Sequence, residues 1–257
     1  MKVFFAEDFS QYNEEIILTL KKFKTSGTII GNGNRNVVKI FEISGLLFNF
    51  KSFKQHNIIN RHVYKFYRKS KARRSFEYAQ LLLDKNFCTP KPVAYIENHD
   101  FIGLTSSYYI SEHLENTFTL ADVLFNRDFP GRTEIIKEYT ALIYALHENG
   151  IQFIDNTAGN FLIRQENGAY RFYMVDLNRI NVYARIKIPK RLKNFGKLTL
   201  DLTFDKEILR IISEEYASLS GLSSEYCFRE ISRASNKMLI KRKVKKVLKL
   251  YKYLIRI

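Results

Sequence analysis

The alternation of apolar and polar positions divides the chain into a strand-rich first part and a helix-rich second part. Between residues 27 and 53, the runs VVKIFEI and LLFNFKSF alternate and are rich in β-branched and aromatic residues, with Gly45 between them. This pattern predicts a strand, a turn and a second strand. The start of the chain and the runs VAYIE and SSYYISEHL predict further strands.

Helical spacing marks several other segments. In SKARRSFEYAQLLLDKNF, apolar or small residues recur every three or four positions, and the following TPKP prevents the helix from continuing. The segment RTEIIKEYTALIYALHENG has one apolar face and ends at Asn149-Gly150. Helices are also predicted in NEEIILTLKKF, TLADVLFN, DKEILRIISEEYASLSG and the basic C-terminal segment.

These elements predict an α+β protein with two lobes that share a cleft. Residues 1–112 form a small lobe with an antiparallel sheet and one helix, and residues 113–257 form a larger helical lobe that carries a short hairpin. A chain of 257 residues, 46% of them apolar, is long enough for two such lobes.

Composition indicates a protein of the cytoplasm. Cys88 and Cys227 lack metal-type spacing and suit a reducing compartment. The apolar run at the start of the chain, in MKVFFAEDFS, is too short for the core of a signal peptide. No apolar run approaches the ~18 residues of a membrane-spanning helix. We therefore expect a soluble or peripheral membrane protein.

The net charge of +16 is concentrated at the C-terminus, where residues 233–257 contain ten Lys or Arg and no acid. Apolar residues recur there with helical spacing, which predicts a basic amphipathic helix. Two interpretations remain open: a last helix packed on the large lobe, or a helix that binds an anionic membrane surface. Nucleic acid is not expected, because no zinc spacing or RNA-binding signature is present.

Three polar residues follow apolar runs at positions where strands should end. QFIDNTAGNFLI carries Asp155 and Asn160, and RFYMVDL carries Asp176. Each alone is more simply a turn residue. A helix, D-x-x-x-x-N, a turn and a strand ending in Asp nevertheless follow the order of a kinase catalytic loop and its metal-binding aspartate.

The first lobe contains matching candidates for a nucleotide site. GNGNRN supplies Gly31 and Gly33 in a turn between apolar runs, FNFKSF places Lys51 late in a strand, and Glu77 lies on the following helix as a partner for that lysine. Lys54 is the competing strand lysine. Each signal is weak alone, and the order of all five features carries the kinase interpretation.

At this point the sequence resembles the lipopolysaccharide kinase family, the Kdo and heptose kinases with a protein-kinase-like fold, especially the short versions from Bacteroidetes. The resemblance covers roughly residues 27–180. The helix SKARRSFEYAQ followed by TPKP is more specific to this family than the generic kinase features. The resemblance as a whole rests on three segments: FKSFKQHNIINRHVYKFYRKSKARRSFEYAQLLLDKNFCTPKPVAY, GIQFIDNTAGNFLI and YRFYMVDLNRI.

The resemblance implies ATP and Mg²⁺ as cofactors. Lys51 would contact the ATP phosphates, and Glu77 would hold it in an ion pair. Asp155 would be the catalytic base, while Asn160 and Asp176 would bind magnesium. Backbone groups at the hinge would meet adenine, at Glu112, His113 and Leu114.

The resemblance also implies a lipid-anchored acceptor, Kdo–lipid A or its core sugars, at the cytoplasmic face of the inner membrane. The basic C-terminal helix would then lie on the anionic membrane surface. The segment KIPKRLKNFGK at 187–197 could meet sugar carboxylates and phosphates, although a solvated loop is the expected structure there.

Two departures keep other functions open. Phe153 replaces the histidine that supports the catalytic loop in such kinases, and Leu177-Asn178 follow Asp176 in place of Phe-Gly. A kinase-like binding protein with impaired catalysis is one alternative. A protein or small-molecule kinase with the same catalytic residues is another.

Overall fold

The computed structural model describes residues 1–31, 36–53, 68–200 and 206–254, and the chain folds into two compact units. Unit 1 comprises Met1–Thr117 together with Tyr173–Arg179, and unit 2 comprises Phe118–Phe172 together with Ile180–Ile257. The predicted boundary at residue 112 thus lies five residues before the end of the first segment, and unit 1 also takes a later segment.

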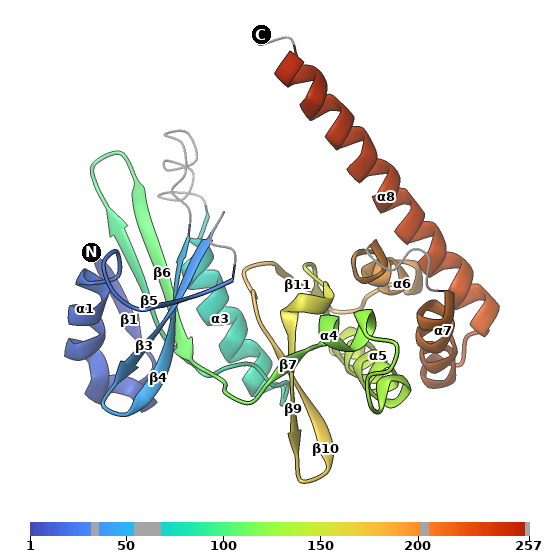
Figure 1. The fold of residues 1–257 in the computed structure, drawn as a ribbon, viewed down its shortest axis with the longest axis horizontal. Helices are drawn as coiled ribbons and strands as arrows, with labels where there is room; N and C mark the ends of the chain where they lie inside the picture. The colour runs from blue at the N-terminus through green and yellow to red at the C-terminus, as the bar shows by residue number, and fades with distance from the viewer. Residues whose placement is uncertain (32–35, 54–67, 201–205, 255–257) are drawn as a thin grey trace. The chain divides into compact units, whose positions relative to one another are not determined.

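Unit 1 is built on a six-stranded antiparallel sheet with the strand order β1-β5-β6-β4-β3-β2 (Figure 1). A short 3-10 helix, η1, and α1 precede β2, and α3 lies between β4 and β5. The bounds are β1 Lys2–Phe5, η1 Glu7–Tyr12, α1 Asn13–Lys21, β2 Thr28–Ile30, β3 Asn36–Ile43, β4 Leu46–Phe53, α3 Lys71–Asp84, β5 Pro92–His99 and β6 Leu104–Glu112.

The hairpin of β3 and β4 confirms the predicted strand, turn and strand. Ser44 and Gly45 both have positive φ, at 49° and 78°, as a two-residue hairpin turn requires. Phe48 and Phe50 point to one face of the sheet, into a core with α1 residues. Because side chains alternate along a strand, Lys51 lies on the opposite face, with Phe53.

Helix α3 packs on that second face. Its residues Ala72 and Phe76 form a buried cluster with Phe53 and with Tyr95 of β5. The Ser70 side chain accepts a hydrogen bond of 3.0 Å from the Arg73 backbone N–H and so caps the helix. The helix ends before TPKP, as predicted.

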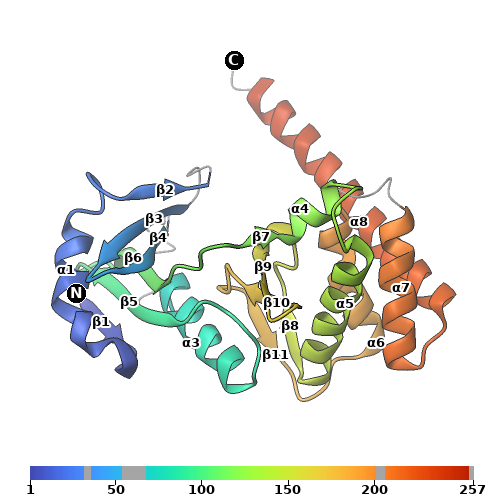
Figure 2. The ribbon, with the colours of Figure 1, turned by 60° about the horizontal axis from the view of Figure 1, so that its bottom comes forward.

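Unit 2 is mainly helical and carries two small sheets, β10-β9-β7 and β11-β8 (Figure 2). Helix α5 packs against α7, and α7 packs against α8. The last two residues of β10 belong to unit 1. The bounds are β7 Phe118–Thr119, α4 Leu120–Phe125, α5 Arg132–Glu148, β8 Ile151–Phe153, η2 Ala158–Asn160, β9 Phe161–Glu166, β10 Ala169–Met174, β11 Ile180–Val182, α6 Ile188–Asn194, η3 Phe195–Leu200, α7 Lys206–Ser220 and α8 Ser224–Leu254.

The connection from α5 to β8 requires a glycine. Gly150 has φ +71°, and a Cβ atom there would lie 2.0 Å from the carbonyl oxygen of Tyr183. The Gly150 carbonyl accepts a 2.9 Å hydrogen bond from the Tyr183 backbone N–H. This close approach aligns β8 with β11 and fixes where the chain leaves β8 for Asp155.

The segment 187–197 is not the solvated loop that its charge predicted. It forms α6 and the start of η3, and Leu192 and Phe195 are fully buried within it. Arg191 and Asn194 are also buried, because their polar groups bond to neighbouring elements of unit 2. Charge alone therefore gave the wrong structure for this segment.

Helix α8 has 31 residues and two different halves. Its first half is packed, with Cys227, Ile231 and Ala234 buried. In its second half, the described apolar side chains are more than half exposed, and Figure 1 shows this half extending past α6 and α7. The exposed fractions are 62% for Ile240, 51% for Val244, 64% for Val247 and 54% for Leu248. None of the described helices is both long and apolar enough to span a membrane.

Candidate active site

Asp155 lies two residues after the end of β8, in a tight loop. The backbone N–H of Thr157 and the side-chain amide of Asn160 both donate to the Asp155 carbonyl, each at 2.8 Å. Since the Asn160 nitrogen is used to brace the loop, its side-chain oxygen is the atom that Asn160 can offer to a metal. The loop therefore holds the predicted base and one predicted metal ligand in a fixed relation.

A third residue joins this loop from far along the chain. The Lys197 ammonium lies 2.5 Å from Oδ1 of Asp155, and the two side chains are 26% and 20% exposed. Lys197 belongs to η3. The sequence suggested only that the segment 187–197, which ends at Lys197, could meet sugar carboxylates and phosphates, and nothing in the local pattern links residue 197 to residue 155.

Phe153 is buried beneath the loop, and a polar network there supports it. The Asn194 side chain donates to the Phe153 carbonyl at 2.8 Å. The Asn156 side chain donates to the Asn194 carbonyl at 3.2 Å and accepts from the Tyr139 hydroxyl at 2.6 Å. These hydrogen bonds tie the loop to α5 and α6 without the histidine that Phe153 replaces.

His147 of α5 completes the network. Its Nε2 lies 3.0 Å from Oδ1 of Asn194, and its Nδ1 lies 3.0 Å from the Tyr216 hydroxyl. Because Oδ1 of Asn194 can only accept, Nε2 carries the proton and Nδ1 accepts from Tyr216. Burial lowers the pKa of His147 to about 4, so the imidazole is neutral at physiological pH.

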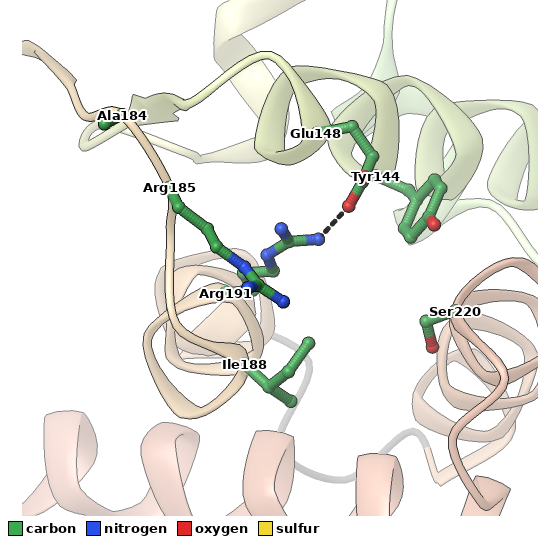
Figure 3. Close-up of a pocket in the computed structure, with 7 residues that line it drawn as sticks. All are labelled: Tyr144, Glu148, Ala184, Arg185, Ile188, Arg191 and Ser220. Atoms are coloured by element: carbon green, nitrogen blue, oxygen red, sulfur yellow. Dashed lines mark hydrogen bonds and ion pairs between the residues drawn. The ribbon is translucent and has the colours of Figure 1, made fainter.

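Unit 2 also contains a cavity of about 440 Å³, in which an ion pair joins Arg191 of α6 to Glu148 of α5 (Figure 3). The pair anchors α6 to the end of α5. None of the residues predicted for catalysis lies in the wall of the cavity. The lining residues are Tyr144, Glu148, Ala184, Arg185, Ile188, Arg191 and Ser220.

In unit 1, Lys51 and Asp176 meet although 125 positions separate them in the sequence. The Lys51 ammonium lies 2.6 Å from Oδ1 of Asp176, and the Asn178 side chain donates to the same oxygen at 2.5 Å. Asp176 has φ +60°, a conformation that few residues other than glycine adopt and that often marks a functional site. Asn178, which stands where a kinase glycine is common, thus orients the Asp176 carboxylate.

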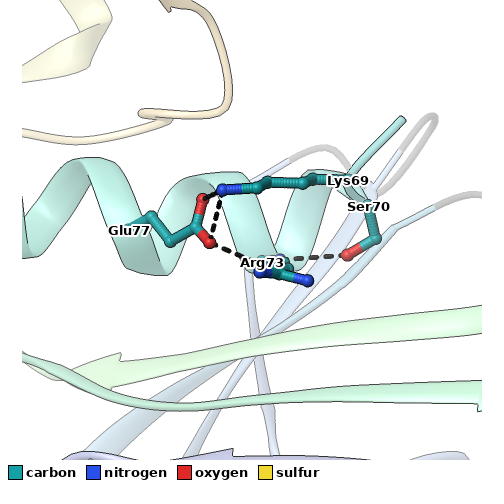
Figure 4. A network of polar contacts seen from close by, with 4 residues as sticks. All are labelled: Lys69, Ser70, Arg73 and Glu77. Carbon is teal, nitrogen blue, oxygen red and sulfur yellow. Dashed lines mark hydrogen bonds and ion pairs between the residues drawn. The ribbon is translucent and has the colours of Figure 1, made fainter. Parts of the chain in front are cut away.

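Glu77 does not pair with Lys51, so the predicted ion pair between them is wrong for this structure. Its carboxylate bonds to the Lys69 ammonium at 2.8 and 2.9 Å and to Nε of Arg73 at 2.8 Å (Figure 4). Arg73 lies four positions before Glu77 on α3, so the two side chains share one face of the helix. Burial opposes ionisation of Glu77, but the hydrogen bonds from these two cations outweigh it and lower its pKa.

Lys71, at the start of α3, adds a second ammonium near Lys51. The two ammonium groups lie 6.0 Å and 5.5 Å from the centre of the same Phe53 ring. Burial lowers the pKa of Lys71, and the positive charge of Arg74 lowers it further. The face of the sheet around Asp176 is therefore rich in cations, as a site for phosphates should be.

The predicted hinge follows the end of β6. The Glu112 carbonyl accepts a 3.3 Å hydrogen bond from the Asn49 side chain, and the His113 N–H donates to the Leu47 carbonyl at 2.8 Å. Burial raises the pKa of Glu112. Leu114 comes next in the chain, and its contact with adenine stays a prediction.

The glycine turn lies between β2 and β3. Gly31 has φ +73°, and a Cβ atom added there would meet nothing within 4 Å. Gly33 and Lys54 lie outside the described residues, so the contribution of Gly33 and the choice between Lys51 and Lys54 stay predictions. The ion pair of Lys51 with Asp176 favours Lys51.

A model of the lipopolysaccharide kinase (Kdo/WaaP) family matches residues 29–209, which is more than half of the chain. The chain belongs to this family. Its members are kinases, so this Kdo/WaaP family protein is a phosphotransferase that acts on an alcohol group.

A solved structure, "WaaP in complex with acyl carrier protein", matches the fold of this Kdo/WaaP family kinase. The TM-score is 0.65 at 16% identity, over 96% of this chain and 99% of that chain. At this identity the match shows the fold alone, and it confirms the predicted α+β kinase-like architecture. No curated protein sequence matches the chain.

The metal ligands predicted for this Kdo/WaaP family kinase suit magnesium. Within the described ranges, no three or more His, Cys, Asp or Glu side chains gather as a metal site. Magnesium in kinases usually takes only one or two carboxylates and completes its shell with phosphates and water. The Asp176 carboxylate in unit 1 and the Asn160 amide oxygen in unit 2 are each a donor that fits this ion by its chemistry, and their assignment to one magnesium site stays a prediction.

Proposed function

We propose that this protein transfers the γ-phosphate of ATP to a sugar hydroxyl of the lipopolysaccharide inner core, on Kdo or heptose attached to lipid A. The observation that carries the proposal is the loop after β8, where Asn160 braces the backbone of Asp155. Family membership supports the substrate class.

Each residue has a distinct role in this proposal. The acceptor oxygen forms a bond to the γ-phosphorus, its proton passes to Asp155, and the bond from phosphorus to the bridging oxygen breaks to leave ADP. Magnesium would be held by Asn160 and Asp176 and would neutralise charge on the phosphates. Lys51 contacts the phosphates. The phosphates therefore compete with the Asp176 carboxylate for the Lys51 ammonium.

Mass measurement of the acceptor lipid tests the proposal. The purified protein is incubated with ATP, magnesium and Kdo–lipid A, and in parallel with a heptose-bearing core lipid. We expect a gain of one phosphate on one of the two lipids, with no gain when magnesium is chelated. ATP binding without phosphate transfer to either lipid would favour a kinase-like binding protein.

We also propose that the second half of α8 binds an anionic membrane surface, at the cytoplasmic face of the inner membrane. Its exposed apolar side chains and the surrounding lysines and arginines support this contact, because a soluble helix seldom leaves such a stripe uncovered. Each basic residue near the headgroups adds about 1 kcal/mol of binding. The acceptor lipid would be held in the same membrane.

Vesicle binding tests the α8 proposal. Binding to anionic vesicles should weaken steeply with salt and should be lost on truncation after Ser235, which keeps the packed half of α8. Charge-neutral vesicles are the control. The solved WaaP complex suggests another occupant, a protein such as an acyl carrier protein. Salt-sensitive binding to that protein, with none to vesicles, would favour it.

A further inference from the structure

Lys197 stands out because a cation beside a general base has two possible uses. It either neutralises the base or binds the charge that develops next to it. We propose that Lys197 is a catalytic residue whose ammonium binds the phosphoryl group while it is transferred. This inference rests on the proposed function of Asp155 as the base.

Three distances around Asp155 place the Lys197 ammonium next to the reacting group. A base accepts a hydroxyl proton at ~2.7 Å, and the hydroxyl oxygen attacks phosphorus from ~3–3.5 Å. Since Nζ of Lys197 lies 2.5 Å from the Asp155 carboxylate, it lies within a few ångströms of the attacked group. A carboxylate can accept from an ammonium and from a hydroxyl together, because it offers about four lone-pair sites.

The fold fixes Lys197 in this position. Its neighbours Phe195 and Leu198 are buried, with exposed fractions of 0% and 3%. Gly196 lies so close to α8 that a Cβ atom there would be 3.1 Å from both the carbonyl carbon and the Cβ of Ala234. The packed half of α8 thus holds η3 in place, and the partial burial of Lys197 strengthens its interaction with nearby charge.

The change in charge on Asp155 during the reaction explains the role of Lys197. The attacking hydroxyl gives its proton to Asp155, so the negative charge of that carboxylate is lost as the reaction proceeds. The ammonium is then released from its ion pair while charge is present on the phosphoryl oxygens beside it. Lys197 gives up no proton, and its interaction is stronger in the transition state than before it, which is what accelerates a reaction.

Lys197→Met tests the proposal, with Lys137→Met as its control, since Lys137 is an exposed lysine of α5 in the same unit. We expect Lys197→Met to lower kcat by ~10²-fold with the KM values for ATP and acceptor within threefold of the parent. Lys197→Arg should recover part of the loss, and Lys137→Met should match the parent. Parent-like turnover of Lys197→Met, or a rise in the acceptor KM without a fall in kcat, overturns the proposal.

A binding measurement separates this proposal from the proposed function. ADP, magnesium and aluminium fluoride mimic the transferred phosphoryl group without an acceptor. Lys197→Met should weaken binding of this complex by at least tenfold, measured by calorimetry, and leave binding of ADP with magnesium unchanged. If the parent phosphorylates no lipid yet shows this difference, only the acceptor assignment fails. Equal binding by parent and variant overturns the role of Lys197.

Discussion

The groups around the proposed base in unit 2 and those around the proposed ATP lysine in unit 1 are held by different kinds of interaction. Around Asp155 in unit 2, the supporting groups are buried hydrogen-bonding side chains, with exposed fractions of 0% for Asn156, 1% for His147 and 7% for Asn194. Around Lys51 in unit 1, the contacts are ion pairs with partly exposed partners, 33% for the side chain of Asp176.

This difference separates a preorganised scaffold from a set of exchangeable charges. A buried hydrogen bond is costly to break, because a polar group left without a partner loses about 1–3 kcal/mol. A partly exposed ion pair contributes about 0–1 kcal/mol and can be replaced by a ligand phosphate or a metal. The unit 2 loop should therefore be complete before substrate binds, whereas the charges of unit 1 should rearrange around the nucleotide.

The largest effect is expected from Asp155→Asn. Loss of a general base lowers kcat by ~10²- to 10⁴-fold, while the neutral amide keeps the size of the side chain. Binding of ATP should be unchanged, because the loop scaffold does not depend on the Asp155 carboxylate. Single-turnover phosphate transfer and nucleotide titration measure the two quantities. Turnover within threefold of the parent removes Asp155 from the role of base.

Lys51→Met should lower kcat/KM for ATP by about 10²-fold, as loss of a charge aimed at the phosphates does. Unlike Asp155→Asn, Lys51→Met should also weaken nucleotide binding, because the Lys51 ammonium leaves its ion pair with Asp176 to contact the phosphates. Lys69→Met is the matched control, since Lys69 pairs with Glu77. Equal effects of the two substitutions would contradict the assignment of Lys51.

Asn194→Ala tests the scaffold itself. It removes the donor to the Phe153 carbonyl and the acceptor of His147, so the free energy of unfolding should fall by about 2–3 kcal/mol. Turnover should fall about tenfold, because Asp155 loses support for its position. Urea unfolding and kcat are measured, with exposed Asn181→Ala as the control. A stability loss without any change in kcat would separate the network from catalysis.

The sequence predicted the parts of the fold that local pattern determines. Alternation located β3 and β4, and helical spacing located α3 and α5, because these elements bury one face each. The order of Asp155, Asn160 and Asp176 predicted a kinase loop, because that order reflects the chemistry of the nucleotide rather than the packing around it, and their catalytic roles stay predictions.

The contacts between distant segments could not be read from the sequence. Lys197 reaches Asp155 only because η3 packs on α8, and Asn194 supports Phe153 only because α6 returns beneath the loop. The basic residues of α6 look solvated in sequence, since burial of Arg191 depends on partners 5 and 43 positions away. Glu77 was assigned to Lys51 by analogy, whereas Arg73 is closer along α3.

The neutral state of His147 should make the scaffold sensitive to acid. Its pKa is lowered from 6.5 to about 4, so protonation favours the unfolded chain once the pH falls below about 6.5. Stability should fall by about 3 kcal/mol between pH 6.5 and 4, and be unaffected by this group above pH 6.5. His147→Gln should remove this pH-dependent part, which thermal unfolding at several pH values measures. An identical pH profile in the variant would show that other groups dominate.

The smallest effect is expected from Glu77→Gln. In this structure its partners are Lys69, just before α3, and Arg73, on α3 itself, and its side chain is 32% exposed, so the free energy of unfolding should change by less than ~1 kcal/mol. Turnover should stay within threefold of the parent, because Lys51 is held by Asp176. This result tests how far the charges of unit 1 rearrange when the nucleotide binds. If Glu77→Gln lowers kcat as strongly as Lys51→Met, Glu77 must exchange Arg73 for Lys51 when the nucleotide binds, and the charges of unit 1 rearrange further than the phosphate contacts alone require.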